Sequence, residues 1–312
     1  MNHPLGPLRA LATADGSLSL HSTHFDEAFH SSIGALAEAE AKFVRPAELE
    51  RFRQSREVRV LDVCFGLGYN SAAVMSALPE SGPPRMLWWG LELDQRPLEQ
   101  AMDHQPFRDL WPAAVRQRLD QLQRDGHWHD SGGQGTMLWG DARRNLRALP
   151  DSCKLDLILL DAFSPSRCPQ LWSEEFLGGL ADRLAPGGRL LTYCRAAAVR
   201  SSLRRAGLDL RSLLPAPRAR IEWSSGTMAV KPLGKEQLAA EGPGWTSLSV
   251  MEEEHLQTRA SVPYRDPKGD DDAQGIQQRR QLEQQSCALE STSAWQRRWM
   301  KPASRRPCSS IG

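Results

Sequence analysis

The stretch VRVLDVCFGLGYN, Val58–Asn70, carries the pattern that decides the fold. It begins with an apolar run of strand length and continues through a pair of glycines into a helical stretch. The same succession recurs downstream in MLWWGLE, TMLWGDA, LDLILLDA and RLLTYC. Apolar runs without polar alternation are typical of strands buried on both faces, and helices between such strands favour a parallel sheet. The pattern predicts an α/β fold with a Rossmann-like, doubly wound and mostly parallel sheet.

The composition is that of an ordinary globular protein. With 312 residues, of which 40% are hydrophobic and 25% charged, the chain can bury a sizeable core. No apolar run is long enough to cross a bilayer, and the N-terminus MNHPLGPLRA lacks the order of a secretory signal, so we expect a cytoplasmic protein. The six scattered cysteines indicate neither a zinc site nor a disulfide framework. A net charge of +1 means that a nucleic acid must be bound by local basic patches.

Two regions are expected before the C-terminus. Residues 1–57 form an N-terminal extension, in which Asp15-Gly16 favours a tight β-hairpin and IGALAEAEAKFV favours a helix that ends before Pro46. Residues 58–234 form the α/β domain, in which Ser173 is expected to cap a crossover helix. The runs LDLRSLL and GTMAV are expected to pair as its last two strands.

The segment 235–312 is polar, rich in Gln and low in aliphatic residues, so we expect it to be largely disordered. Its last part combines Arg and Lys residues with Trp295 and Trp299. Such a basic tail can bind RNA through phosphate pairing and base stacking. Charge runs are more often only solubilising, and a solvated tail without a partner is the favoured interpretation.

Residues suited to binding a ligand, either glycines or carboxylates, stand at the ends of four successive strands. Gly66 and Gly68 follow the first, where they let the backbone approach a ligand. Glu92 ends the second and can accept hydrogen bonds from both hydroxyls of a ribose. Asp141 follows the third, where it can accept from the amino group of an adenine or cap a helix. Asp161 follows the fourth, and all lie on the carboxyl edge where such sheets bind ligands.

Other interpretations remain open at this point. An oxidoreductase acting on CH–NH groups with NAD or FAD is disfavoured, because a dinucleotide fingerprint requires a glycine where Ser71 stands. A catalytically idle RNA-binding protein is disfavoured by the retained carboxylates. His127 and His129 flank Trp128, but they lack a third ligand, and we expect no metal site.

The segments FGLGYN, LWGDA and LLDAFSPSRCPQLWSEEF resemble the methyltransferase half of the tRNA-modifying enzyme MnmC and its stand-alone relative MnmD. The resemblance covers roughly Thr13 to Val230. It implies a class I methyltransferase that uses S-adenosyl-L-methionine. It further implies methylation of the 5-aminomethyl group of (2-thio)uridine at the tRNA wobble position. A methyltransferase acting on another RNA or on a small amine stays an alternative, because this fold serves many acceptors.

The resemblance also assigns roles to residues. It places Asp161 beside the reacting amine, as the catalytic residue. The implied cofactor contacts are Gly66, Gly68, Asn70, Glu92, Asp141 and Glu38. The implied substrate contacts are the wall residues Phe163, Pro165 and Trp172 and the two basic residues Arg218 and Arg220, which approximate a basic segment of the family.

The flavin-dependent half of MnmC, which strips a carboxymethyl group, has no expected counterpart here. After Gly234 the sequence shows neither a second strand-borne glycine fingerprint nor sufficient length for such a domain. We therefore expect methyl transfer without the oxidative step and without FAD. The expected partner is tRNA, with no membrane and no obligate protein partner.

Overall fold

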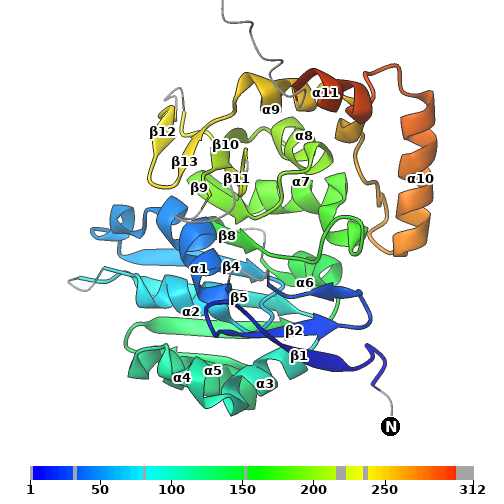
Figure 1. Ribbon diagram of the computed structural model, residues 1–312. Coiled ribbons are helices and arrows are strands. Elements are labelled where there is room, and N and C mark those ends of the chain that lie inside the picture. Colours follow the sequence, from blue (N-terminus) through cyan, green and yellow to red (C-terminus); the bar gives the residue numbers. More distant parts are fainter. Residues whose placement is uncertain are drawn as a thin grey trace, which may run out of the picture.

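The computed structural model describes residues 3–30, 34–79, 82–150, 153–215, 223–234 and 238–299. Its centre is a ten-stranded sheet in the order β12-β13-β10-β11-β9-β8-β4-β5-β7-β6 (Figure 1). The strands are β4 (Glu57–Val63), β5 (Arg85–Glu92), β6 (His127–Asp130), β7 (Gly133–Trp139), β8 (Leu155–Leu160), β9 (Leu184–Thr192), β10 (Asp209–Leu213), β11 (Gly226–Val230), β12 (Glu241–Gly242) and β13 (Trp245–Ser247).

The middle of the sheet is parallel, as the apolar runs predict. Strands β7, β5, β4, β8 and β9 pair in parallel, whereas the outer strands pair in antiparallel fashion. The expected pairing of LDLRSLL with GTMAV is confirmed, because β10 and β11 are neighbours. From β4 the chain passes to β5 on one side, and β8 lies on the other. In sheets of this type, the crevice outside the strand ends at this reversal is the ligand-binding place.

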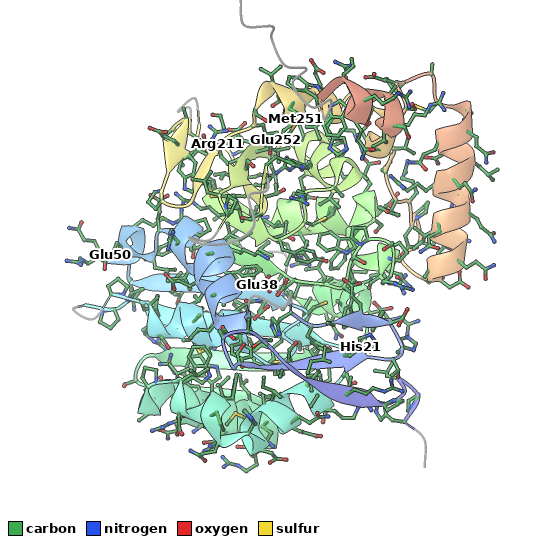
Figure 2. The ribbon with its side chains drawn as sticks, in the orientation of Figure 1. His21, Glu38, Glu50, Arg211, Met251 and Glu252 are labelled. Atoms are coloured by element: carbon green, nitrogen blue, oxygen red, sulfur yellow. The ribbon has the colours of Figure 1, made fainter. Side chains whose placement is uncertain are left out.

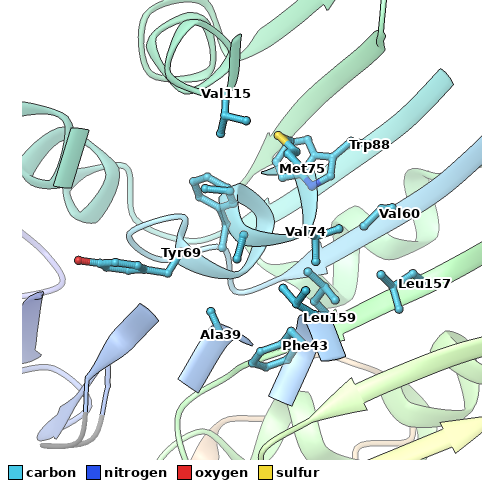
Figure 3. Packing of buried hydrophobic residues seen from close by; sticks show 14 of the residues in the cluster. Ala39, Phe43, Val60, Tyr69, Val74, Met75, Trp88, Val115, Leu157 and Leu159 are labelled. Atoms are coloured by element: carbon cyan, nitrogen blue, oxygen red, sulfur yellow. The ribbon is translucent and has the colours of Figure 1, made fainter. Parts of the chain in front are cut away.

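Helices cover both faces of the sheet. Val60 and Leu159 face one apolar layer together with Phe43 (Figure 3). Leu61 and Leu160 face the other layer. None of the helices in the described ranges is long and apolar enough to cross a membrane. The helices that precede β10 are α1 (Ala35–Ala39), α2 (Tyr69–Ser76), α3 (Arg96–Asp103), α4 (Gln105–Asp109), α5 (Ala113–Asp125), α6 (Ala142–Ala148), α7 (Glu174–Arg183) and α8 (Ala197–Arg205).

The N-terminal extension forms a second, three-stranded sheet. Its strands β1 (Leu8–Ala12) and β2 (Leu18–Ser22) make the expected hairpin, and β3 (Glu27–Ala28) pairs with β2. The helix expected after it is α1, which continues as a π-helical turn, Glu40–Val44, and a 3-10 turn, Arg45–Ala47. Helical structure therefore runs through Pro46, because proline at the start of a new turn lacks only an N–H that the turn leaves unbonded anyway.

The C-terminal segment, which we define as residues 238–299, corrects the expectation of a largely disordered tail. It carries α9 (Val250–His255), α10 (Ala273–Ser286) and α11 (Thr292–Trp299). Helices α9 and α11 lie together next to α8, and α10 stands at the edge of the molecule (Figure 1). Buried apolar side chains anchor it, among them Trp245, Leu256, Ile276 and Trp295. The composition misled the prediction because a few separate anchors bury this segment, not a continuous apolar face. Residues 300–312 lie outside the described residues.

Candidate active site

A cavity of about 510 Å³ lies where β4, β5, β7 and β8 end. This volume is typical of small-molecule sites. Of the residues expected at the site, those that line the cavity are Glu38, Gly66, Asn70, Glu92, Asp141, Asp161 and Phe163. Gly68, Pro165 and Trp172 do not line it, and Arg218 and Arg220 lie outside the described residues. The strand tips therefore do converge on a single hollow.

Asp161 lies just beyond β8 and is held by α2. Its side chain accepts a hydrogen bond of 2.7 Å from Asn70, in the first turn of that helix. Burial raises the pKa of Asp161 to about 6, although the bond from Asn70 and the charge of Lys42 oppose the shift. A carboxylate with a pKa in this range can take up a proton near neutral pH.

The glycine loop between β4 and α2 needs both of its glycines. Gly66 has φ of 56°, and a Cβ there would come within 3.2 Å of the Phe29 ring. Gly68 has φ of 93°, and a Cβ there would come within 2.7 Å of Phe65. Both conformations favour glycine. Gly66 leaves backbone facing the cavity, whereas Gly68 forms the start of α2.

Glu92, at the end of β5, fixes the loops around it. Its carboxylate accepts from the backbone N–H groups of Gly66, Leu93 and Asp94, at 2.8, 2.6 and 2.9 Å. Burial raises the pKa of Glu92, while these backbone bonds lower it. Carboxylate oxygens have about four acceptor sites together, so Glu92 can still accept from a ligand hydroxyl.

Asp141 caps α6, as the sequence allowed. Its side chain accepts from the backbone N–H of Arg143 at 2.9 Å, and the Arg143 guanidinium binds the same carboxylate with a shortest distance of 2.7 Å. Burial raises the pKa of Asp141, but the bonds from Arg143 outweigh it and hold the pKa below its ordinary value. Asp141 is thus a fixed anion at the cavity wall.

An aromatic wall stands beside Asp161. The Phe163 ring stacks on Phe25 with centroids 4.5 Å apart and meets Phe29 edge-on at 5.0 Å. Trp172 is completely buried, and its indole N–H donates to the Phe163 carbonyl at 2.7 Å. The structure therefore corrects the role expected for Trp172, which supports the wall from behind. Pro165 is half-buried within the same loop and away from the cavity lining.

Sequence reasoning missed much of the cavity that the N-terminal extension supplies. Phe25, Glu27 and Phe29 all line it, together with Lys42, which pairs with Glu38 at 3.0 Å. Figure 2 shows Glu38 in the middle of the molecule. These residues precede the sheet in sequence, and no local pattern indicates that they return to its edge.

Comparisons with known proteins show what the chain is similar to. A protein family described as S-adenosyl-L-methionine-dependent methyltransferase matches residues 105–227. The chain is 32% identical over 216 residues to the tRNA 5-methylaminomethyl-2-thiouridine biosynthesis bifunctional protein MnmC of Azoarcus sp. (strain BH72), covering 66% of this chain and 33% of that protein. It is 30% identical to the MnmC of Caulobacter vibrioides, covering 72% of this chain and 39% of that protein. The match therefore spans only about a third of these relatives.

The solved structure of MnmC2 from Aquifex aeolicus is similar over most of both chains. The TM-score is 0.75 at 28% identity, and the match covers 92% of this chain and 88% of that one. Taken with the sequence matches, this likeness extends to the C-terminal region that the family match leaves out. The chain is therefore an S-adenosyl-L-methionine-dependent methyltransferase of the MnmD type, related to the methyltransferase half of MnmC.

Proposed function

We propose that the protein methylates the amine of the 5-aminomethyl group of (2-thio)uridine at the tRNA wobble position, giving 5-methylaminomethyl-2-thiouridine. The observation that carries the proposal is the Asp161 carboxylate with its raised pKa, which shares one cavity with Glu92, Asp141 and an aromatic wall. The MnmC relatives are named for the biosynthesis of tRNA 5-methylaminomethyl-2-thiouridine, which supports this choice of acceptor.

The cavity suits the cofactor that the family implies. S-Adenosyl-L-methionine, when bound, supplies an electrophilic methyl group on a positively charged sulfur. Glu92 would accept from the ribose hydroxyls and Asp141 from the adenine amino group. The backbone at Gly66 and the side chains of Asn70 and Glu38 would hold the methionine part. The several carboxylates around the cavity also favour a cationic ligand.

Asp161 would orient the acceptor amine and accept the proton that this amine loses. As the amine nitrogen forms its bond to the methyl carbon, the carbon–sulfur bond breaks and the nitrogen must lose one proton. Asp161, with a pKa of about 6, is mostly ionised at neutral pH and can accept that proton directly or through a water. Most of the rate would come from holding the nitrogen in line with the methyl group.

The aromatic wall would receive the modified base. Phe163 and Phe25 offer apolar ring surface on which a uracil ring can stack. Arg218 and Arg220, outside the described residues, are the proposed contacts to the anticodon backbone. We propose that this methyl transfer takes place in the cytoplasm, where tRNA is modified.

The test is methylation in vitro with two tRNA substrates. One carries 5-aminomethyl-2-thiouridine at the wobble position and the other carries unmodified uridine there. Mass spectrometry of the digested nucleosides should show one added methyl group on the first and none on the second. Equal methylation of both tRNAs, or of a small amine alone, would overturn the assignment of the acceptor.

A binding experiment separates the methyltransferase from the oxidoreductase alternative. Calorimetry with S-adenosyl-L-homocysteine should give saturable binding, whereas NADH should give none. The reverse result would reject the cofactor assignment.

A further inference from the structure

The C-terminal segment reaches the cavity wall through Asp266. Between α9 and α10 the chain contacts α7 through Glu175 and α6 through Arg143. Asp266, which makes both contacts, is 1% exposed. One oxygen of its carboxylate accepts from Nη1 of Arg143 at 2.7 Å. The opposite edge of the same guanidinium donates from Nη2 and Nε to Asp141, at 2.7 and 3.1 Å. Arg143 therefore bridges the C-terminal segment and the candidate cofactor site.

Asp266 is itself held rigidly. Its second carboxylate oxygen accepts from the backbone N–H groups of Gly269, Asp270 and Asp271, at 3.0, 3.2 and 3.1 Å. Its own N–H donates to Glu175 of α7 at 2.8 Å. The carbonyl of Asp271 accepts a further bond from Nη1 of Arg143 at 2.9 Å. The far end of the guanidinium is thus fixed by two acceptors of the C-terminal segment.

This arrangement matters because a guanidinium is planar and its donors have fixed directions. Fixing Nη1 fixes the plane that Nε and Nη2 present to Asp141. Without the C-terminal acceptors, Arg143 would regain side-chain freedom, and the Asp141 carboxylate would lose a partner of defined direction. Besides the backbone N–H of Arg143, the Asp141 carboxylate therefore has a side-chain support that is itself fixed by Asp266, 123 positions away from Arg143.

We propose that Asp266 is a positioning residue for the cofactor, which acts through Arg143 to hold Asp141 in the orientation that accepts the amino group of adenine. The C-terminal segment is then a part of the cofactor site. This inference rests on the proposed function, which places the adenine beside Asp141.

Calorimetry with S-adenosyl-L-homocysteine tests the inference on the full-length protein. Asp266→Asn keeps the shape of the side chain and removes its charge, and it should weaken binding by about five- to tenfold, within the range of coupling between neighbouring residues. With a saturating methyl donor the variant should keep its kcat and show a raised KM for that donor. The control is Glu253→Gln, which breaks an exposed pair of the same segment with Arg204 and should leave binding unchanged.

A double-mutant cycle separates positioning from general loosening of the segment. In an Asp141→Asn background, Asp266→Asn should cause no further loss of affinity, because its target is gone. If Asp266→Asn does not fold, Arg143→Lys replaces it in the same cycle. Lysine keeps the positive charge but lacks the planar guanidinium, whose donors bind Asp141 and Asp266 at the same time.

The inference is overturned if Asp266→Asn leaves the affinity for S-adenosyl-L-homocysteine unchanged. It is also overturned if Asp266→Asn lowers that affinity equally in the unmodified protein and in the Asp141→Asn background. Failure of the unmodified protein to bind S-adenosyl-L-homocysteine overturns the proposed function itself and the inference with it.

Discussion

At the scale of single residues, two carboxyl groups, one in β4 and one just beyond the neighbouring β8, have different surroundings. Asp161 opens to the cavity and has Asn70 as a donor. Asp62, in β4, is fully buried, and one of its oxygens accepts from the Ser71 hydroxyl at 2.6 Å. Its other oxygen has no hydrogen-bond partner among the described residues. Burial above all, with the nearby charges of Asp161 and Glu92, raises the pKa of Asp62 to about 7.

Replacing Asp161 by Asn should lower kcat by roughly 10²- to 10⁴-fold, the usual contribution of a positioned base. In the unmodified protein, the rate should fall as the pH drops below about 6, because protonation of Asp161 removes the proton acceptor. Steady-state kinetics from pH 5 to pH 9 should show this fall in rate at low pH in the unmodified protein and not in the variant. Turnover that survives the substitution would exclude Asp161 from the chemistry.

Replacing Asp62 by Asn should make stability less dependent on pH. The pKa of Asp62 is raised from its ordinary 3.8 to about 7, so the folded state holds a proton that the unfolded chain has lost. The unmodified protein therefore loses stability as the pH rises through this window, by at most about 1.4 kcal/mol per pH unit for one group, and the loss is complete above 7. Urea unfolding at pH 5, 6, 7 and 8 measures the free energy of unfolding of both proteins. If it changes with pH in the same way in the unmodified protein and in Asp62→Asn, the prediction is contradicted.

At the scale of elements, the N-terminal sheet is tied to the loop that follows β8. Glu27 of β3 accepts from the N–H and the hydroxyl of Ser164, at 3.1 and 2.6 Å. Beside it, the exposed Asp26 pairs with Arg167 at 2.8 Å. The contact between Glu27 and Ser164 is stronger than the pair of Asp26 and Arg167, because it is less exposed and uses two donors. It holds the Phe25 and Phe163 rings together at the cavity.

Glu27→Ala should therefore raise the KM for the proposed tRNA substrate by roughly tenfold, which corresponds to the loss of one charge-assisted hydrogen bond. The affinity for S-adenosyl-L-homocysteine should change little, because Glu92 and Asp141 are untouched. Asp26→Asn is the matched control, since an exposed ion pair contributes little. An equal effect of both substitutions on KM would show that the Ser164 contact has no special role.

At the scale of the whole molecule, the C-terminal segment is joined to the α/β domain by a buried ion pair. Arg200 of α8 and Glu252 of α9 lie 2.8 Å apart, with side chains 1% and 2% exposed. Arg200 also donates to Thr227 and Ser224 near β11. The pair therefore fixes the segment to both a helix and the sheet of the α/β domain.

Glu252→Gln should lower the free energy of unfolding by about 3–5 kcal/mol, because it leaves the Arg200 charge buried without its counter-ion. The adjacent Glu253→Gln breaks an exposed pair with Arg204 and should cost no more than about 1 kcal/mol. Urea unfolding of the two variants gives both values. Similar values for the two would mean that the segment is held mainly by its apolar anchors.

The sequence by itself determined the parallel sheet and the carboxylates at its edge. The apolar runs around Val60 and Leu159 are local patterns, and each strand carries its own end residue, so Glu92, Asp141 and Asp161 could be placed without coordinates. The resemblance to MnmC added Asn70 and Glu38, both of which line the cavity.

Only the tertiary structure decided which distant segments complete the site. Glu27 meets Ser164 across 137 positions, and Asp266 meets Arg143 across 123. Such contacts leave no periodic trace, because a single polar side chain can make them from a segment of any composition. For the same reason the sequence could not reveal that Asp62 is buried without a full set of partners, or that a polar C-terminal segment packs as part of the fold.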